Sequence, residues 1–513
     1  LVLFFLIEDF WLVLNSIYFL YFNNYFHILN FLFHLQTNFS SINEGISFLS
    51  AVNAIGWVSR FSILLIDIVP FIIMLNSNIF ENLKILLKSK IPKLIWISTL
   101  IALIISEIFS NISGRGIMYT FSKLFKEGLS SKEEKELIKR YGTIFVNFLD
   151  IFYIINEDII YRNVDYGQKI EFNGNERKNI IVIQVESLDS SILNTYYKGI
   201  PIVPFLRNMT TNSMFYPIVI SYHFAGYSSD AEFTVLNSLH PLKDIPSIRY
   251  WKDYKNSIAK VFKSNNYLVY AFHNNRSTFF GREEGYRKMG FDKFFDIEEM
   301  KLEEKGWGAS DEDTLEYVKI KLKTIKNTNF FIYIITMSSH GPFTFVKNYY
   351  TNDLFEDIQD EITKNYFNSM NYVDKVISNF VKFVEKEIPN TILIIFGDHH
   401  SSVQDSNYYK RSVSYLNSKI IEIVPLFIIG HNQKKIITTP ISQLDIPPTI
   451  LKLAGIKGSI RSKGEVVIPH PKKETIFFLG ENISKNEIIQ NLNFPILDYI
   501  HQNYILTTTK SNN

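Results

Sequence analysis

The chain has 513 residues, of which 46% are hydrophobic, so its length and composition allow more than one domain and a sizeable core. Its formal net charge is only +2 and its basic residues are spread along the chain, which argues against a nucleic-acid partner. Cysteine is absent, which excludes disulfides, thiolate metal ligands, cysteine nucleophiles and a formylglycine derived from cysteine.

The first 110 residues predict membrane-spanning helices, because three apolar regions approach the roughly 20 residues that cross a bilayer. These regions are residues 12–35, 49–75 and 91–109. Buried helices of a soluble protein are the alternative, since the second region contains Arg60 and Asp67, although their spacing suits a pair within a helix bundle. The chain starts with Leu1 rather than Met and is apolar at once, so we expect native sequence upstream and regard three spans as a minimum.

The loop between the second and third regions indicates how the chain is oriented. Its sequence "ENLKILLKSKIPK" carries four lysines, Lys84, Lys88, Lys90 and Lys93. Because basic residues accumulate in cytoplasmic loops, the third span is expected to run outward. We therefore expect a multi-pass plasma-membrane protein in which everything after about Ser110 is extracytoplasmic.

The next segment, residues 111–177, is amphipathic and charged and predicts a juxtamembrane helical linker. Within it, "SSKEEKELIKR" has Ser and Glu at the spacing of a capping box. The predicted division is thus 1–110 for the transmembrane helices, 111–177 for the linker and 178–513 for the extracytoplasmic domain.

From residue 178 onward, short apolar runs alternate with longer helical patterns. The runs are "NIIVIQVE" (179–186), "YLVYAFH" (267–273), "FFIYIITMSSH" (330–340), "TILIIFGDHH" (391–400) and "PLFIIG" (425–430). Continuous apolar strands that alternate with helices predict an α/β fold in which a mostly parallel central sheet is covered by helices on both faces.

Four of the five runs end in ionisable residues, namely Glu186, His273, His340 and the cluster Asp398-His399-His400. In an open α/β sheet, ligands bind outside the carboxyl ends of the strands. A single polar residue at a strand end is ordinary, but four such coincidences favour a site at this edge.

The chemistry of Glu186, Asp398 and His399 suits a divalent metal, because carboxylate oxygens and imidazole nitrogens bind Zn²⁺, Mn²⁺ or Mg²⁺. A further ligand is available in "HFAGYSSDAEF" (223–233), where Ser228 and Ser229 precede a helical run. A hydroxyl at a helix N-terminus beside a metal is activated as a nucleophile, and the alternative is an ordinary capping serine. Spacing alone does not separate the two serines.

Six motifs carry a family resemblance. They are "NIIVIQVESLD", "GYSSDAEF", "HNNRSTFFGREEGYRKMGFDKFFD", "MSSHGPF", "FGDHH" and "SQLDIPPTILKLAGI". Their order and spacing over residues 179–455 resemble those of lipoteichoic acid synthases and related phosphoglycerol transferases, which belong to the alkaline phosphatase and sulfatase superfamily.

The resemblance implies a role for each matching residue. Glu186, Asp398 and His399 resemble metal ligands, and Ser228 stands where the family has a threonine that is both nucleophile and ligand. The residues implied in substrate binding are His273, Phe280, Arg282 and His340. Phe280 replaces a tryptophan and Asn275 replaces an aspartate, which leaves the headgroup open. Arg282 has the alternative of pairing with Glu283 or Glu284. Ser229 is expected to cap the backbone N–H groups of Glu232.

The implied function is that of a membrane-anchored transferase with one divalent ion, expected to be Mn²⁺, with Mg²⁺ or Zn²⁺ as alternatives. It would move a phospho-headgroup, expected to be phosphoglycerol, from a glycerophospholipid donor to an alcohol of a cell-envelope polymer or glycan acceptor through a covalent seryl intermediate. One alternative is a phosphoethanolamine transferase, and another is a degraded membrane sensor or scaffold. A sulfatase is disfavoured, because "GYSSDAEF" lacks the Ser/Cys-x-Pro-x-Arg context of formylglycine formation.

Overall fold

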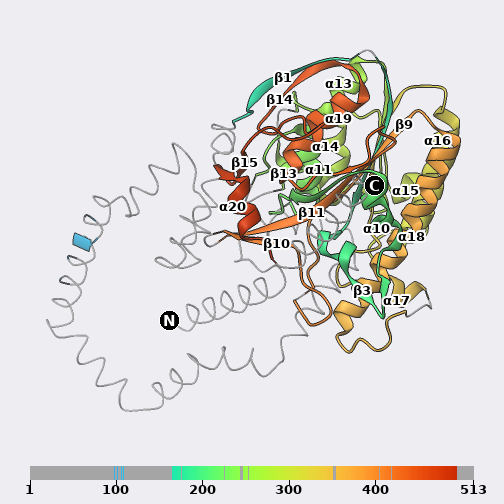
Figure 1. Ribbon diagram of the computed structural model, residues 1–513. Coiled ribbons are helices and arrows are strands. Elements are labelled where there is room, and N and C mark those ends of the chain that lie inside the picture. The colour runs from blue at the N-terminus through green and yellow to red at the C-terminus, as the bar shows by residue number, and fades with distance from the viewer. Residues whose placement is uncertain are drawn as a thin grey trace, which may run out of the picture. The chain divides into compact units, whose positions relative to one another are not determined.

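The computed structural model describes residues 165–493 except 175, 225, 243–245, 252–253, 351–353, 404 and 417–418, together with helical Ser98, Ile101, Ile105, Ser106 and Ile108. The chain divides into two compact units, Leu1–Asp165 and Tyr166–Asn513. The second unit holds all the elements discussed below (Figure 1). The expected spans 12–35 and 49–75, the lysine loop and all of 111–164 lie outside the described residues. Among the residues that are described, no helix combines the length and apolar character needed to span a bilayer.

The second unit is built on one large central sheet, which has ten strands in the described part of the chain. Its main path runs β12 (Lys435–Ile436), β5 (Met214–Ile220), β11 (Lys419–Ile429), β9 (Thr391–Gly397), β2 (Asn179–Val185), β8 (Phe330–Ile335), β6 (Leu268–His273) and β7 (Lys293–Phe295). Two further strands lie off this path, with β10 (Val413–Leu416) beside β11 and β13 (Ile441–Ser442) beside β5.

The sheet is mixed: most neighbouring strands are parallel, as predicted, but the pairs that involve β11 are antiparallel. Strands β9, β2, β8 and β6 are parallel to one another, as the apolar runs predicted, and β7, which no run included, is parallel to β6. By contrast, β11 is antiparallel to both of its neighbours, β9 and β5. The run 425–430 was therefore wrongly assigned to a parallel sheet. The reason is that the chain enters β11 from an antiparallel pairing with β10 instead of a helical crossover.

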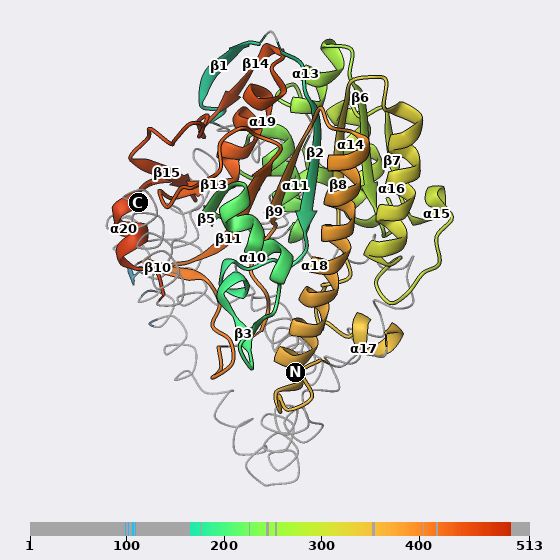
Figure 2. The same ribbon diagram turned by 45° about the vertical axis from the view of Figure 1, so that its right-hand side comes forward.

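Helices cover both faces of the sheet, as predicted for an α/β fold (Figure 2). One face carries α10 (Pro204–Asn212), α16 (Asp311–Ile325) and α18 (Glu361–Glu387), and the other carries α11 (Ser228–Asn237), α13 (Ile258–Ser264), α14 (Arg282–Met289) and α19 (Ile446–Ala454). The shorter helices are α12 (Ser247–Tyr250), α15 (Ile297–Met300), α17 (Phe345–Tyr349) and α20 (Lys485–Gln490). Two small hairpins are β3 (Tyr196–Tyr197) with β4 (Ile200–Pro201) and β15 (Thr475–Phe478) with β16 (Glu481–Ser484).

The start of the second unit is a strand that sequence reasoning placed in the linker. Strand β1 (Gln168–Asn173) pairs antiparallel with β14 (Lys457–Ser462) over its whole length, from Gln168 opposite Ser462 to Asn173 opposite Lys457. The compact unit consequently begins at Tyr166 rather than at residue 178.

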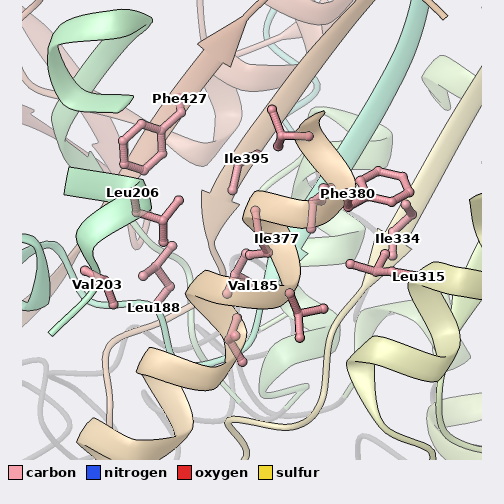
Figure 3. Close-up of a cluster of buried hydrophobic side chains, with 14 of the residues drawn as sticks. Val185, Leu188, Val203, Leu206, Leu315, Ile334, Ile377, Phe380, Ile395 and Phe427 are labelled. Carbon is pink, nitrogen blue, oxygen red and sulfur yellow. The ribbon is translucent and has the colours of Figure 1, made fainter. Parts of the chain in front are cut away.

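A large hydrophobic cluster fills the space between the sheet and α18 (Figure 3). Alternate residues of β2, Ile181, Ile183 and Val185, point into this cluster, because side chains alternate between the two faces of a strand. The intervening residues Ile180 and Val182 are equally buried under the helices of the other face, which explains why both faces of this strand carry apolar side chains. From α18, Ile377 and Phe380 enter the cluster at helical spacing.

We expect Ile377→Ala to lower the stability of the second unit. Ile377 is fully buried in the cluster, so its truncation removes apolar contacts and leaves a cavity, which costs about 2–5 kcal/mol. Thermal melting followed by circular dichroism measures the effect. Lys375→Ala changes an exposed residue of the same helix and should leave the melting temperature nearly unchanged. Equal melting temperatures for the two variants would contradict this account of the core.

Candidate active site

The strands of the sheet that run parallel to β2 end at the same edge, and polar side chains gather there. Strands β2 and β9 are parallel neighbours in register, with Val185 opposite Gly397, so Glu186 emerges beside Asp398 and His399. The antiparallel β11 begins at the same edge, because Ile423 pairs with Ile220 near the end of β5. The carboxyl edge thus collects residues from both the parallel and the antiparallel parts of the sheet.

Glu186, Asp398 and His399 form a compact ligand group. Their ligand atoms lie within 4.8 Å of one another, and all three residues are largely buried. His399 Nε2 lies 3.3 Å from Glu186 Oε1 and 3.6 Å from Asp398 Oδ2. These separations are close to the roughly 3.3 Å expected between neighbouring ligand atoms around a tetrahedral ion with bonds of about 2.0–2.1 Å.

Ser228 completes this group. Its Oγ donates to Glu186 Oε2 at 2.7 Å and lies 3.3 Å from His399 Nε2. The structure thus brings together the four side chains that the sequence predicted as metal ligands.

Two further observations fit these residues to a divalent cation. In the described part of the chain, buried Asp398 Oδ2 has no hydrogen-bond partner, although Oδ1 accepts from the backbone N–H groups of Ser187 and His399. His399 Nδ1 donates to the carbonyl oxygen of His400 at 2.7 Å, which fixes the ring and leaves the Nε2 lone pair directed at the group.

The charges of the group are strongly coupled. Burial and the charge of Glu186 raise the pKa of Asp398 well above its usual value. Burial also acts to raise the pKa of Glu186, but the charge and hydrogen bond of His399 outweigh it and hold that pKa below its usual value. Burial lowers the pKa of His399, yet the charges of Asp398 and Glu186 raise it further, to well above its usual value. The two carboxylates therefore favour a positive charge between them.

A tight turn presents Ser228 at the first residue of α11. Tyr227 precedes it with φ of +48°, a left-handed conformation unusual for a bulky residue. Asp230 holds the turn, since its Oδ2 accepts from the backbone N–H groups of Phe224 and Gly226 at 2.9 and 3.0 Å. A Cβ on Gly226 would lie 2.1 Å from Asp230 Oδ1, so the turn requires glycine here.

The expected role of Ser229 as a helix cap was wrong. Its side chain is fully buried and its hydroxyl donates back to the Gly226 carbonyl oxygen at 2.5 Å, so it is not aimed at the backbone of Glu232. The Asp230 carboxylate organises the turn instead, and Ser229 points away from the hydroxyl position that Ser228 occupies.

Of the two predicted substrate histidines, His273 is the last residue of β6, and His340 lies in a turn five residues after β8 ends at Ile335. His273 is buried, its Nδ1 lies 3.4 Å from the Ile335 carbonyl oxygen, and its Nε2 has no partner within the described residues. Burial, together with the charge of Arg282, holds the pKa of His273 well below its usual value, so the ring is neutral. His340 is partly exposed and donates from Nδ1 to the Gly341 carbonyl oxygen at 2.7 Å, which leaves Nε2 available.

Arg282 pairs with neither Glu283 nor Glu284. It is only 2% exposed, and its Nη2 and Nε lie 2.6 and 3.0–3.1 Å from the oxygens of fully buried Glu232, which also accepts from the Tyr286 hydroxyl at 2.9 Å. Within the described residues, Arg282 Nη1 is buried without a hydrogen-bond partner. Phe280 is buried too, and its ring lies 5.1 Å from the guanidinium carbon.

Sequence reasoning missed Trp307. Its ring lies 4.7 Å from that of His340, and both line a cavity together with Lys305, Thr344, Phe345 and Tyr349. The segment "GWGAS" carried the only signal, a tryptophan between two glycines in a loop. Phe280 is buried, whereas Trp307 contacts His340, one of the two histidines predicted to bind substrate.

Sequence reasoning also missed the residues that form hydrogen bonds with the backbone of Glu186 and Asp398. Thr336 Oγ1 accepts from the backbone N–H of Glu186 at 3.0 Å, and Ser339 Oγ donates to its carbonyl oxygen at 2.6 Å. Gln443 Nε2 donates to the carbonyl oxygen of Asp398 at 2.8 Å. These contacts fix both ligand-bearing strand ends before any ion binds.

Comparison with known proteins agrees with this geometry. The family model described as Sulfatase matches residues 178–456. The chain is 28% identical over 345 residues to lipoteichoic acid synthase 2 of Bacillus subtilis, covering 64% of this chain and 53% of that protein. It is 26% identical over 303 residues to lipoteichoic acid synthase of Staphylococcus aureus, covering 55% and 46%. The chain thus spans about half the length of the curated relatives it matches.

A solved structure shows the same similarity. The lipoteichoic acid synthase LtaP from Listeria monocytogenes superposes with a TM-score of 0.53 at 27% identity, covering 61% of this chain and 80% of that one. The resemblance inferred from the six motifs is therefore confirmed. With its family match, its α/β fold and its relatives among lipoteichoic acid synthases, the chain belongs to the sulfatase family.

Proposed function

We propose that this protein is a membrane-anchored, divalent-metal-dependent transferase that moves phosphoglycerol from a glycerophospholipid to an alcohol of a cell-envelope polymer or glycan. The observation that carries the proposal is the Ser228 hydroxyl, which the turn before α11 holds 2.7 Å from Glu186 and 3.3 Å from His399. The similarity to lipoteichoic acid synthases supports phosphoglycerol as the transferred group.

In the first half of the proposed reaction, Ser228 Oγ attacks the phosphorus of the donor lipid in line. A bond forms between Oγ and phosphorus, the bond from phosphorus to the diacylglycerol oxygen breaks, and the hydroxyl proton passes to solvent. Glu186, Ser228, Asp398 and His399 would hold a Mn²⁺, Mg²⁺ or Zn²⁺ ion. When bound, such an ion lowers the pKa of a hydroxyl and offsets charge on a phosphoryl group.

Arg282 would bind a phosphoryl oxygen, and His273 would bind a hydroxyl group of the donor. Arg282 keeps one buried donor, Nη1, after Glu232 has engaged its Nε and Nη2. An unpaired buried donor is costly unless a ligand satisfies it, so a bound phosphate would stabilise Arg282 Nη1. His273 Nε2 has no partner in the described part of the chain, and because Nδ1 of the neutral ring faces a carbonyl oxygen, Nε2 is an acceptor.

In the second half, an acceptor alcohol attacks the same phosphorus, the bond from phosphorus to Ser228 Oγ breaks, and Ser228 regains a proton from solvent. Because His340 donates from Nδ1 to a backbone carbonyl, its Nε2 is available to protonate the departing diacylglycerol oxygen and then to accept the proton of the acceptor alcohol.

We expect Ser228→Ala to lose the covalent intermediate. Without the nucleophilic oxygen, turnover should fall by on the order of a thousandfold or more, or about 4 kcal/mol of barrier. Mass spectrometry of the full chain after incubation with phosphatidylglycerol and phosphatidylethanolamine measures the adduct, and its mass distinguishes phosphoglycerol from phosphoethanolamine. Ser228→Thr keeps an alcohol at this position and should remain active.

Ser229→Ala is the matched control for this experiment. It removes one buried hydrogen bond to the Gly226 carbonyl, worth about 1 kcal/mol, and that carbonyl still accepts from the backbone N–H of Ser229. The adduct should therefore still form in Ser229→Ala. An adduct that persists in Ser228→Ala but is absent from Ser229→Ala would identify Ser229, rather than Ser228, as the nucleophile.

We expect Asp398→Asn to weaken metal binding without destabilising the metal-free protein. The amide oxygen can accept the same two backbone N–H groups, while the change removes a charge that opposes Glu186. Metal affinity should fall at least about tenfold, by isothermal titration calorimetry, whereas the melting temperature of the metal-free protein should not fall. The exposed substitution Asp357→Asn should alter neither quantity. Unchanged metal affinity in Asp398→Asn would exclude Asp398 as a ligand.

We also expect the second unit to be extracytoplasmic, since the donor lipid would be used at the outer face of the membrane and the lysine loop predicts this orientation. Protease added to intact cells should degrade the second unit while a cytoplasmic marker protein stays whole. Complete protection of the second unit until the cells are permeabilised would overturn the proposed topology.

A further inference from the structure

A glutamine, Gln184, interrupts the apolar core strand β2, and the proposed reaction does not involve it. It lies between Ile183 and Val185, and its side chain is fully buried. Burying an amide group is costly unless its polar atoms form hydrogen bonds. Nε2 donates to the backbone carbonyl oxygen of Ser228 at 3.0 Å, and Oε1 accepts from the Tyr333 hydroxyl at 2.6 Å. The partners of this amide are therefore the residue that carries the proposed nucleophile and a tyrosine of β8.

The two partners fix the orientation of the amide. A carbonyl oxygen can only accept, so the nitrogen of Gln184 faces Ser228 and its oxygen faces Tyr333. Tyr333 belongs to the neighbouring strand β8, where it pairs with Val182, and it is fully buried. Burial raises the pKa of Tyr333 well above its usual value, so the hydroxyl keeps its proton and donates it to the amide oxygen. The tyrosine thus opposes rotation of the amide away from Ser228.

Strand β2 and the residue after it hold Ser228 at two points. Because side chains alternate along a strand, Gln184 and Glu186 face the same side of the sheet. Glu186 Oε2 accepts from the Ser228 hydroxyl at 2.7 Å, whereas Gln184 Nε2 donates to the Ser228 carbonyl oxygen. The first contact ends when the hydroxyl loses its proton and its oxygen bonds to phosphorus. The second contact does not involve the reacting oxygen, so it can persist through both halves of the proposed reaction.

We propose that Gln184 is a positioning residue, which holds the first turn of α11 and the Ser228 hydroxyl in the attacking position, and that Tyr333 acts through Gln184. This inference rests on the proposed function, which assigns Ser228 as the nucleophile. The carbonyl of the first helical residue also accepts the regular hydrogen bond of the helix, so α11 does not need Gln184 to form. What Gln184 contributes is the position of that turn relative to β2 and hence to Glu186.

Paired substitutions separate positioning from stability. Gln184→Met keeps an unbranched side chain but removes the donor, and it leaves the buried Tyr333 hydroxyl without the partner described above. The melting temperature should therefore fall. Adding Tyr333→Phe removes the unpaired hydroxyl, so the double variant should recover most of the lost stability. The rate at which the adduct forms should not recover, because Ser228 still lacks its contact with β2.

The measurement uses the full chain, purified in detergent and mixed with Mn²⁺ and phosphatidylglycerol, and follows the adduct on Ser228 by mass spectrometry over time. At saturating lipid, the rate should be at least about tenfold lower in Gln184→Met and in the double variant, since small displacements of a reacting atom are costly. The lipid concentration that gives half the maximal rate should change little, because Gln184 contacts Ser228 and not the lipid. Gln433→Met changes an exposed glutamine in the same way and should alter neither the rate nor the melting temperature.

The outcomes distinguish this inference from the function on which it rests. A wild-type chain that forms no adduct would overturn the proposed function, and the role of Gln184 with it. An adduct that forms at the wild-type rate in the double variant would overturn the role of Gln184 alone, since its hydrogen bonds would then serve only stability. Gln184→Leu serves as a second variant, with the same expectations, should the chain with methionine fold poorly.

Discussion

The pairing of β2 with β9 is the constraint on which the site depends. Because the two strands are parallel and Val185 lies opposite Gly397, the residues that follow them, Glu186 and Asp398, meet at one edge of the sheet. Gly397 permits the close approach of the chain after β2, since a Cβ there would lie 2.1 Å from the Leu188 carbonyl oxygen. Two buried carboxylates this near each other repel, and the divalent cation that we propose for this site would offset both charges.

Sequence patterns could locate the ligands because the relevant information is local. An apolar run predicts a buried strand, and the polar residue at its end, such as Glu186 or Asp398, then lies at the edge where ligands bind. The direction of β11 was not predicted by the same reasoning. Its run was taken as one more parallel strand, although runs 413–416 and 419–429 are separated by only two residues, a spacing typical of a hairpin. Because of that error, Glu422 was not identified as a residue at the carboxyl edge of the sheet. It lies there only because β11 is antiparallel.

Pairs between residues distant in sequence could not be predicted. The candidates for Arg282 were its neighbours Glu283 and Glu284, but Glu284 pairs with Arg287 at the surface and Arg282 is buried against Glu232, fifty residues away. The contact between Trp307 and His340 likewise joins a loop to a strand end. Such contacts follow from how the layers pack, and neither periodicity nor local spacing reports on packing between layers.

Helix α11 links Ser228, the proposed nucleophile, to the buried arginine. Ser228 is its first residue, and Glu232 follows four residues later, on the same side of the helix. Glu232 engages two nitrogens of Arg282 and accepts from the Tyr286 hydroxyl, so the guanidinium is fixed relative to the helix that carries Ser228. A buried ion pair contributes little net stability, since both charges lose their hydration. Its value here is geometric: one rigid helix sets the position of both the attacking oxygen and Arg282 Nη1, the donor we assign to the phosphoryl group.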